Sequence, residues 1–363
     1  MSEGPQPPDP RLAIEARGLR KVFRRGSIAK VAVDRVDMRV GEGRIVGLIG
    51  PNGAGKSTLI SMLATVMRPT SGDAWVMRHD VVREPRAARG ALSLNAFAGE
   101  RGFYWRLDAL HNLEFFAALQ GLDRQTTRRR VADVLERVGL AEDARLRFGE
   151  FSSGMKRRLN VARALLVRRP VYLFDEPTSG VDPHSAETIR SILRDLKAAG
   201  RTVVLVTHNM AEATELCDEV GMLYAGRLIR QDSPEVLRRH VPASEVEVEL
   251  AEGADTAGVT ARLLGLPAVV EVREQGAGRL RVRTADPERD VRGLLLWAAT
   301  DSLPVAGVSV VRPELAEAFV HLVEEATGEA PDGLVSSLGA PPDASARQRR
   351  ARGFGRMRTW NHP

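Results

Sequence analysis

The fold of this chain is decided by one stretch, Gly50-Pro51-Asn52-Gly53-Ala54-Gly55-Lys56-Ser57-Thr58. It fits the phosphate-loop pattern G-x-x-x-x-G-K-[ST]. The apolar residues 45–49 before it predict a buried strand, and residues 58–64 predict the helix that follows. Glycines at these positions let successive backbone N–H groups face an anion at a helix N-terminus. The stretch therefore predicts a site for a nucleotide triphosphate, against the alternative of a glycine-rich turn without a ligand.

All nine residues of this loop are expected to contact the nucleotide. Lys56 is expected to reach the terminal phosphates. Ser57 is expected to place its hydroxyl on Mg²⁺, a hard cation that keeps several waters and shares phosphate oxygens. The loop therefore predicts both a nucleotide and a metal ion as ligands.

A second signal is the apolar segment 171–174, which ends in Asp175 and Glu176. In a parallel sheet, ligands gather at the carboxyl ends of the strands, so both acids are expected near Lys56. Asp175 suits the Mg²⁺ shell, and Glu176 suits a general base that polarises the attacking water. Alone, such a pair is more typical of a helix cap or a surface pair. After a phosphate loop, the catalytic interpretation is favoured.

The segments around these motifs predict further elements. Short apolar runs at 12–14, 19–23, 31–33 and 36–40 indicate an antiparallel strand layer before the loop. Phe23 ends one of these strands, where its ring would stack on an adenine face or belong to the core. Residues 110–119, 127–138 and 155–166 read as helices. Ser153 and Gly154 open the last of these and predict a second anion site.

Together these residues resemble the ATP-binding subunit of ABC transporters, over about residues 12–235. In that family, residues 50–58 correspond to the Walker A motif, and Asp175 closes Walker B, with Glu176 as the catalytic base. Residues 152–155 are similar to the signature motif and residues 179–182, which end in Asp182, to the D-loop. The segment 206–208 is similar to the switch loop, in which His208 would contact the terminal phosphate. Phe23 takes the place of the adenine-stacking residue.

The resemblance implies a P-loop α/β core with an antiparallel β layer and a helical subdomain at about 95–168. It implies Mg-ATP hydrolysis, with two copies enclosing two nucleotides, so that Ser153 and Gly154 complete the site of the other copy. It also implies a multi-span membrane permease as partner, peripheral attachment to the cytoplasmic face of the membrane, and export of a drug, an antibiotic or a lipid. The alternative is a soluble ABC-type ATPase that acts on ribosomes or nucleic acid, but no nucleic-acid partner is expected.

Two departures from the family pattern stand out. The signature has Phe151, Ser153 and Met155 where the common form has Leu, Gly and Gln. The family also carries a glutamine that touches Mg²⁺ and communicates with the membrane subunit. By spacing, that position is Gly99, and the nearby polar residues are Glu100 and Asn95.

Aromatic residues concentrate next to that position. Five of them lie within 14 residues: Phe103, Tyr104, Trp105, Phe115 and Phe116. They are interpreted either as a local core under a helix or as a groove for a cytoplasmic helix of the membrane partner. The resemblance favours the groove, lined by Tyr104 and Trp105, because aromatic anchors dominate interfaces.

The composition is that of a two-domain globular protein. The chain has 363 residues, of which 43% are hydrophobic, and no apolar run has the length of a membrane span. Residues 1–10 predict a disordered leader rather than a signal peptide. The single cysteine, Cys217, excludes an internal disulfide framework, indicates a reducing cytosol and is assigned no chemistry.

The C-terminal third differs from the rest. Segments after residue 240 predict the order βαββαβα, a small α+β domain of ferredoxin-like type. The resulting limits are 11–239 for the ATP-binding domain, 240–326 for the accessory domain and 327–363 for a disordered basic tail. Residues 341–363 hold six arginines and one aspartate, which carry most of the net charge of +6. The tail is interpreted as a solvated segment or as a contact to the anionic inner leaflet, with nucleic acid as a further alternative.

Overall fold

The computed structural model of the chain describes residues 7–26, 28–95, 102–241, 245–276, 278–284, 286–300, 304–311 and 313–328. They form two compact units, one of the described residues up to Pro234 and from Ala326 on, and the other over Glu235–Glu325. The domain limits predicted at 239 and 240 stay a prediction. In the described part of the chain, no helix combines the length and apolar character needed to cross a bilayer.

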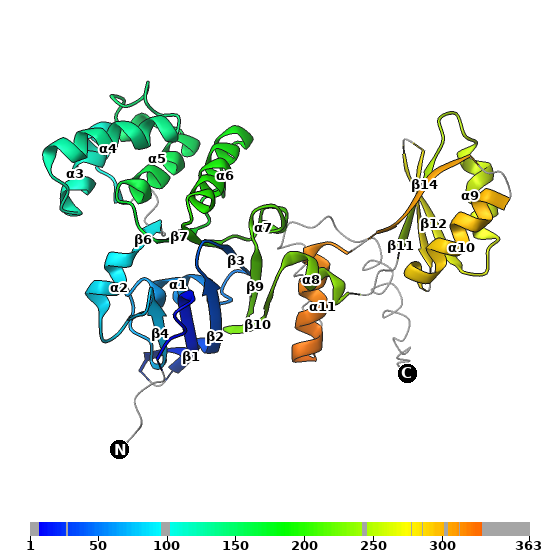
Figure 1. Ribbon diagram of the computed structural model, residues 1–363, viewed down its shortest axis with the longest axis horizontal. Coiled ribbons are helices and arrows are strands. Elements are labelled where there is room, and N and C mark those ends of the chain that lie inside the picture. Colours follow the sequence, from blue (N-terminus) through cyan, green and yellow to red (C-terminus); the bar gives the residue numbers. More distant parts are fainter. Residues whose placement is uncertain are drawn as a thin grey trace, which may run out of the picture. The chain divides into compact units, whose positions relative to one another are not determined.

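The centre of the first unit is a six-stranded sheet (Figure 1). Its order is β10-β9-β3-β8-β7-β6, and neighbours run parallel except β10, which is antiparallel to β9. Every residue of β3, β7 and β8 is buried, as expected for parallel strands covered on both faces. The strands are β3 (Ile45–Ile49), β6 (Leu92–Asn95), β7 (Val171–Asp175), β8 (Thr202–Val206), β9 (Glu219–Tyr224) and β10 (Arg227–Asp232).

Several helices of this unit begin at polar residues whose side chains cap the first turn. Asp108, Asp123 and Ser152 each accept a hydrogen bond from a first-turn N–H of α3, α4 and α5. These three helices lie together beyond β6 and β7 (Figure 1), and the helices predicted there from the sequence are confirmed to within three residues at each end. The helices are α1 (Lys56–Leu63), α2 (Pro85–Ala91), α3 (Ala109–Leu119), α4 (Arg124–Arg137), α5 (Ser153–Leu165), α6 (Pro183–Ala198) and α7 (Met210–Leu216).

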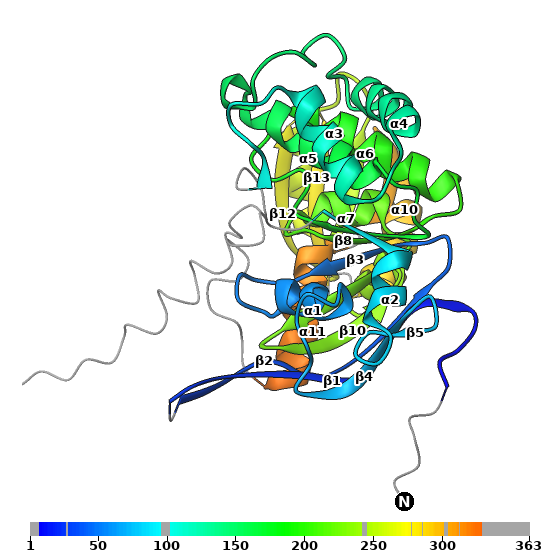
Figure 2. The same cartoon turned by 90° about the vertical axis from the view of Figure 1, so that its left-hand side faces the viewer.

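An antiparallel sheet of order β2-β1-β4-β5 accompanies the core. The prediction of four short strands before the loop is wrong, because they form two long ones, β1 (Leu12–Arg25) and β2 (Ile28–Gly41), joined as the hairpin visible in Figure 2. The segments that looked like turns are absorbed by register shifts, where Gly18 and Arg35 take positive φ angles of 55° and 52°. The remaining strands are β4 (Ser71–Val76) and β5 (His79–Asp80).

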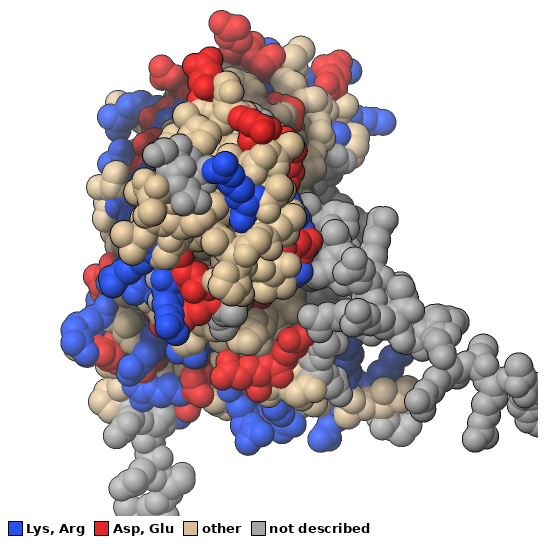
Figure 3. All heavy atoms as spheres, turned by 90° about the vertical axis from the view of Figure 1, so that its right-hand side faces the viewer, with Lys and Arg blue, Asp and Glu red and all other residues tan. Residues whose placement is uncertain are grey.

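The second unit is built on a four-stranded antiparallel sheet of order β12-β13-β11-β14. Its apolar core includes Val246, Val248 and Leu263, while Glu and Arg side chains of β11 and β13 alternate with the core positions. Uncharged residues predominate on the face visible in Figure 3. The predicted element order is confirmed: β11 (Glu245–Leu250), α9 (Thr256–Leu264), β12 (Val269–Gly276), β13 (Arg279–Thr284), α10 (Pro287–Thr300), β14 (Val305–Val311) and α11 (Leu315–Thr327), preceded by α8 (Pro234–Arg239).

Candidate functional site

The phosphate loop connects β3 to α1 by close approach to neighbouring backbone. A Cβ atom at Gly50 would lie 2.1 Å from the carbonyl oxygen of Leu223, and one at Gly55 would lie 2.3 Å from that of Ala32. Both glycines also have positive φ angles, 152° and 105°. Only glycine fits these positions, so the loop holds the N–H groups of the first turn of α1 free of side-chain cover.

Lys56 is the first residue of α1 and is buried beneath the loop. Its Nζ atom donates hydrogen bonds to the carbonyl oxygens of Gly50 at 2.6 Å and Pro51 at 3.0 Å. Burial lowers the pKa of Lys56, and the charges of Glu176 and Asp175 oppose this effect. The ammonium group therefore lies between the loop and two carboxylates, where an anion would become its third partner.

Ser57 and Asp175 meet across the site from segments 118 residues apart. The Oγ atom of Ser57 donates a hydrogen bond of 3.3 Å to Oδ2 of Asp175. Burial raises the pKa of Asp175 to about 6, with a smaller contribution from Glu176, while the bond from Ser57 acts in the opposite direction. A hydroxyl and a carboxylate are ligands that Mg²⁺ prefers, so this oxygen pair fits a magnesium ion.

Glu176 and His208 form the next pair along the same edge of the sheet. A short hydrogen bond joins Nδ1 of His208 to Oε2 of Glu176. Glu176 takes a positive φ angle of 52°, a conformation that non-glycine residues rarely adopt and that is often found at functional sites. Its N–H donates to the carbonyl of Val206 at 2.9 Å, which fixes the acid beside the end of β8.

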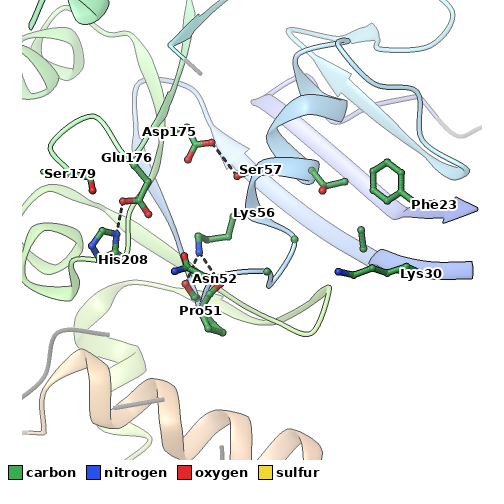
Figure 4. A pocket seen from close by; sticks show the side chains of 15 residues that line it. Phe23, Lys30, Pro51, Asn52, Lys56, Ser57, Asp175, Glu176, Ser179 and His208 are labelled. Atoms are coloured by element: carbon green, nitrogen blue, oxygen red, sulfur yellow. Dashed lines mark hydrogen bonds and ion pairs between the residues drawn. The ribbon is translucent and has the colours of Figure 1, made fainter. Parts of the chain in front are cut away.

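These groups share one cavity of about 620 Å³ (Figure 4). The predicted site residues that line it are Phe23, which is 41% exposed, and residues of the phosphate loop and of the ends of β7 and β8. Ala54 is buried within the loop and does not line the cavity. The lining residues that were predicted are Phe23, Gly50, Pro51, Asn52, Gly53, Gly55, Lys56, Ser57, Thr58, Asp175, Glu176 and His208.

Three further residues line the cavity: Lys30 and Ala32, which were not predicted, and Ser179, which was named only as the start of the D-loop segment. Lys30 lies directly opposite Phe23 in the pairing of β1 with β2. A hairpin predicted over these residues would have paired Phe23 with Lys30. The sequence instead suggested that the strands end before and begin after residues 24–30, so it gave no pairing register. Ser179 lies three residues beyond Glu176, so its place in the D-loop segment already indicated a position close to that carboxylate.

The signature residues Ser153 and Gly154, and Asp182 at the end of the D-loop, lie apart from this cavity, whereas Ser179 at the start of the D-loop lines it. Ser153 is the exposed first residue of α5, and neither it nor Gly154 lines the cavity. A Cβ atom at Gly154 would lie 2.7 Å from Oδ2 of Asp182 and 2.6 Å from Oγ of Ser185. Asp182 caps α6 by accepting a 2.9 Å hydrogen bond from the N–H of Ser185. Within one chain, Gly154 at the start of α5 therefore lies against Asp182 and Ser185 at the start of α6.

The position expected for the missing glutamine is only partly described. Gly99 and Glu100 lie outside the described residues. Asn95 ends β6, is buried, and accepts a 2.7 Å hydrogen bond from the side chain of Asn160. Asn95 does not line the cavity, and its side chain is hydrogen-bonded to α5 rather than directed at the metal position.

The aromatic cluster has a buried part and an exposed part. Phe103 is buried and stacks on Phe148 at 4.7 Å between ring centroids, as a core residue does. Tyr104 and Trp105 are each 51% exposed, and the ammonium of Lys156 lies 4.6 Å from the Trp105 ring. The first residue of the cluster is therefore part of the core, and the two residues predicted to line the groove, Tyr104 and Trp105, are exposed at the surface.

A second cavity of about 470 Å³ lies between α2, β6, α3 and α5. Its charged lining residues are arginines, without a carboxylate among the lining residues. Arg163 lies over the rings of Phe103 and Phe116 at 5.2 and 5.0 Å. Tyr104 and Trp105 do not line it. The cavity is thus lined by arginines and apolar residues, and one of its lining residues, Phe116, belongs to the aromatic cluster.

The chain is similar in sequence to a known protein family and to several curated proteins. The ABC transporter family model matches residues 33–179. The chain is 34% identical over 318 residues to the daunorubicin/doxorubicin resistance ATP-binding protein DrrA of Streptomyces peucetius, covering 86% of this chain and 93% of that protein. It is 31% identical over 310 residues to the linearmycin resistance ATP-binding protein LnrL of Bacillus subtilis, covering 85% of this chain and 97% of that protein.

Solved structures with a similar fold include the dimeric, post-hydrolysis ATP-binding cassette MJ0796 bound to ADP and Pi. It matches with a TM-score of 0.56 and 25% identity, over 61% of this chain and 98% of that one. An ATP-binding subunit of an ABC transporter matches with a TM-score of 0.55 and 28% identity, over 63% of this chain and 92% of that one.

Proposed function

Because the chain belongs to the ABC transporter family of ATP-binding proteins, we propose that it hydrolyses Mg-ATP to power an exporter. One observation carries the proposal: a cation, a hydroxyl–carboxylate pair and a carboxylate–imidazole pair face a single cavity behind a phosphate loop. These are the groups that phosphoryl transfer to water requires. The fold supports the same proposal, because it combines a P-loop core with an antiparallel sheet and a helical subdomain.

The loop and Lys56 bind the phosphates in this proposal. The free N–H groups of the first turn of α1 face the anion, and the helix dipole adds to the attraction. Lys56 keeps its position through Gly50 and Pro51 and directs its charge at the terminal phosphates. Phe23, exposed at the far end of the cavity, stacks on the adenine.

Ser57 and Asp175 hold the metal in this proposal. When bound, Mg²⁺ neutralises charge on the phosphate oxygens. Asp175 must be ionised to act as a ligand, and its raised pKa of about 6 means that it is mostly ionised at neutral pH. The hydrogen bond from Ser57 favours the ionised carboxylate and keeps the two oxygens next to each other.

Glu176 acts as the general base and His208 contacts the terminal phosphate. The short bond between them holds the Glu176 carboxylate at the edge of the cavity. A carboxylate in this position accepts a proton from water while the imidazole stabilises charge on the phosphate. Glu176 lines the cavity and has a positive φ angle, a conformation often found at functional sites.

We propose that the working form is a dimer of this chain. Ser153, Gly154 and Asp182 lie away from the cavity of their own chain, so a contact with nucleotide needs a second copy. The N-terminus of α5, with Ser153 exposed as its first residue, is a suitable anion contact. The dimeric state of the related cassette MJ0796 supports this arrangement.

The membrane partner is proposed to be a multi-span permease that docks at the helical subdomain. This subdomain exposes Tyr104 and Trp105, which suit aromatic anchors of an interface. It also contains the arginine-lined cavity between β6, α3 and α5. Such docking would place the chain at the cytoplasmic face of the membrane. The resistance proteins among its relatives support a drug or antibiotic as the exported substrate and favour export over action on ribosomes or nucleic acid.

For the second unit we propose a ferredoxin-like accessory domain with limits near 240 and 326. The support is the βαββαβ order with the antiparallel sheet order β12-β13-β11-β14.

The function is tested by phosphate release from ATP by the purified chain, alone and with its co-purified membrane partner. Release that requires Mg²⁺, is lost in Lys56→Ala and rises with the permease supports the proposal. Recovery of ribosomal RNA or DNA instead of a multi-span protein, after affinity purification from solubilised membranes, would favour the alternative.

A further inference from the structure

The hairpin of β1 and β2 brings a second cation to the nucleotide cavity. Phe23 and Lys30 are direct partners in the antiparallel register. Side chains that face each other in such a pair leave the sheet on the same side, about 5 Å apart at their Cβ atoms. Both residues line the cavity, and Figure 4 shows the Lys30 ammonium directed from its strand toward the phosphate loop.

The charge of Lys30 is uncommitted within the part of the chain that the structure describes. Its ammonium makes no hydrogen bond or ion pair there, whereas Lys56 is bonded to two carbonyl groups of the loop. Lys21, the other lysine near Phe23, donates to the carbonyl of Arg68 at 2.7 Å and does not line the cavity. Lys30 is therefore the cation at this end of the cavity that is free to meet a ligand.

The carboxylates of the cavity lie at its other end. Asp175 and Glu176 close the site beside Ser57 and His208, where the terminal phosphate is expected. If the base of a nucleotide stacks on Phe23 and its terminal phosphate lies near Lys56, its α-phosphate lies between them, beside strand β2. The negative group nearest to the base then meets the ammonium of Lys30.

We propose that Lys30 binds the α-phosphate of the nucleotide, so that the cavity selects nucleoside di- and triphosphates through cations at both ends of the phosphate chain. This inference rests on the proposed ATP site and adds a contact to it. Lys30 touches no reacting atom, since bond cleavage takes place at the terminal phosphate. Its contribution is expected in binding and not in turnover.

The test compares Lys30→Met with the wild type in calorimetric titrations with Mg-ADP and with a non-hydrolysable Mg-ATP analogue. Loss of one charge-assisted contact at an exposed position is expected to weaken both nucleotides about fivefold to tenfold. Steady-state hydrolysis should show a higher KM for ATP with kcat unchanged. The salt dependence of affinity should become shallower in the variant.

Two further variants make the test specific. Arg24→Met removes the same charge from the same hairpin at a residue that does not line the cavity, so its affinities should match the wild type. Lys30→Arg should retain most of the affinity. Equal binding by wild type and Lys30→Met would overturn the inference, as would a loss confined to the ATP analogue, which would place the contact on the γ-phosphate. Failure of the wild type to bind either nucleotide would instead refute the proposed function.

Discussion

The Nδ1 atom of His208 is joined to Oε2 of Glu176 by a short hydrogen bond, although 32 residues separate them in the chain. The contact exists because β7 and β8 are parallel neighbours, with Asp175 paired to Val206, so both strands end at the same edge. An acid and an imidazole fixed in this way form a single unit at the terminal-phosphate end of the cavity.

Replacing Glu176 by Gln should abolish turnover while keeping nucleotide binding. The amide retains the shape and a hydrogen-bond acceptor but cannot take a proton, so hydrolysis should fall at least about 100-fold. ATP-bound dimers should then accumulate, seen as a larger species in size-exclusion chromatography with Mg-ATP. Undiminished phosphate release would remove Glu176 as the base.

Mixing two inactive variants should restore hydrolysis if sites are completed by a second copy. Lys56→Ala lacks the phosphate contact of its own chain, and Ser153→Asp places a negative charge where the other chain's phosphate is expected. The helix dipole stabilises a negative charge at the exposed start of α5, so the substitution should not impair folding. In a mixed dimer one site keeps both intact residues, and phosphate release should return. Activity of Ser153→Asp alone would argue against a contact in trans.

The stability of the nucleotide-free protein should depend on Asp175 in a defined pH window. Its folded pKa of about 6 exceeds the ordinary value of 3.8, so the folded state prefers the protonated acid. The resulting destabilisation is absent below about pH 4, grows as pH rises toward 6, and is complete above it, at up to about 3 kcal/mol.

Asp175→Asn should therefore raise the melting temperature at pH 7.5 and have little effect near pH 4. The measurement is thermal unfolding of both proteins without nucleotide at the two pH values. Asp195→Asn, at an exposed carboxylate on α6, serves as control. An equal effect of Asp175→Asn at both pH values would contradict the assignment.

Replacing Tyr104 and Trp105 by Ala should release the chain from membranes that contain its partner. Both side chains are half exposed, so their loss removes anchors without opening the core. Membrane flotation should show the release, while Mg-ATP binding stays intact. Leu119→Ala, which removes another exposed apolar side chain at the end of α3, is the matched control. Continued membrane association of the double variant would exclude the aromatic anchors.

Gly47→Ala should destabilise the first unit through a contact with Cys217. The new Cβ atom in β3 would lie 2.9 Å from Sγ of Cys217 and 3.4 Å from Cγ2 of Val220. Overpacking of this kind costs about 1–3 kcal/mol. In urea unfolding, Cys217→Ala should recover part of that loss in the double variant. Additive effects of the two substitutions would show that the two groups do not meet.

Residues 50–58 and the acids at 175 and 176 could be predicted from the sequence because their signals are local. The loop is one continuous stretch, and an apolar run ending in Asp-Glu identifies a strand and its end without reference to anything distant. The helices α3, α4 and α5 were found for the same reason, since the apolar spacing that predicts each of them lies within one segment.

The tertiary structure decided the relations between segments. Hydrophobic periodicity shows which side of a strand is buried, but it gives neither its partner nor its register. For this reason four predicted strands proved to be two, Lys30 emerged opposite Phe23, and Asn95 was found bonded to Asn160. The 3.3 Å bond between Ser57 and Asp175 likewise depends on sheet order. The sequence thus determined which groups form the site, and packing of the sheets determined which of them meet.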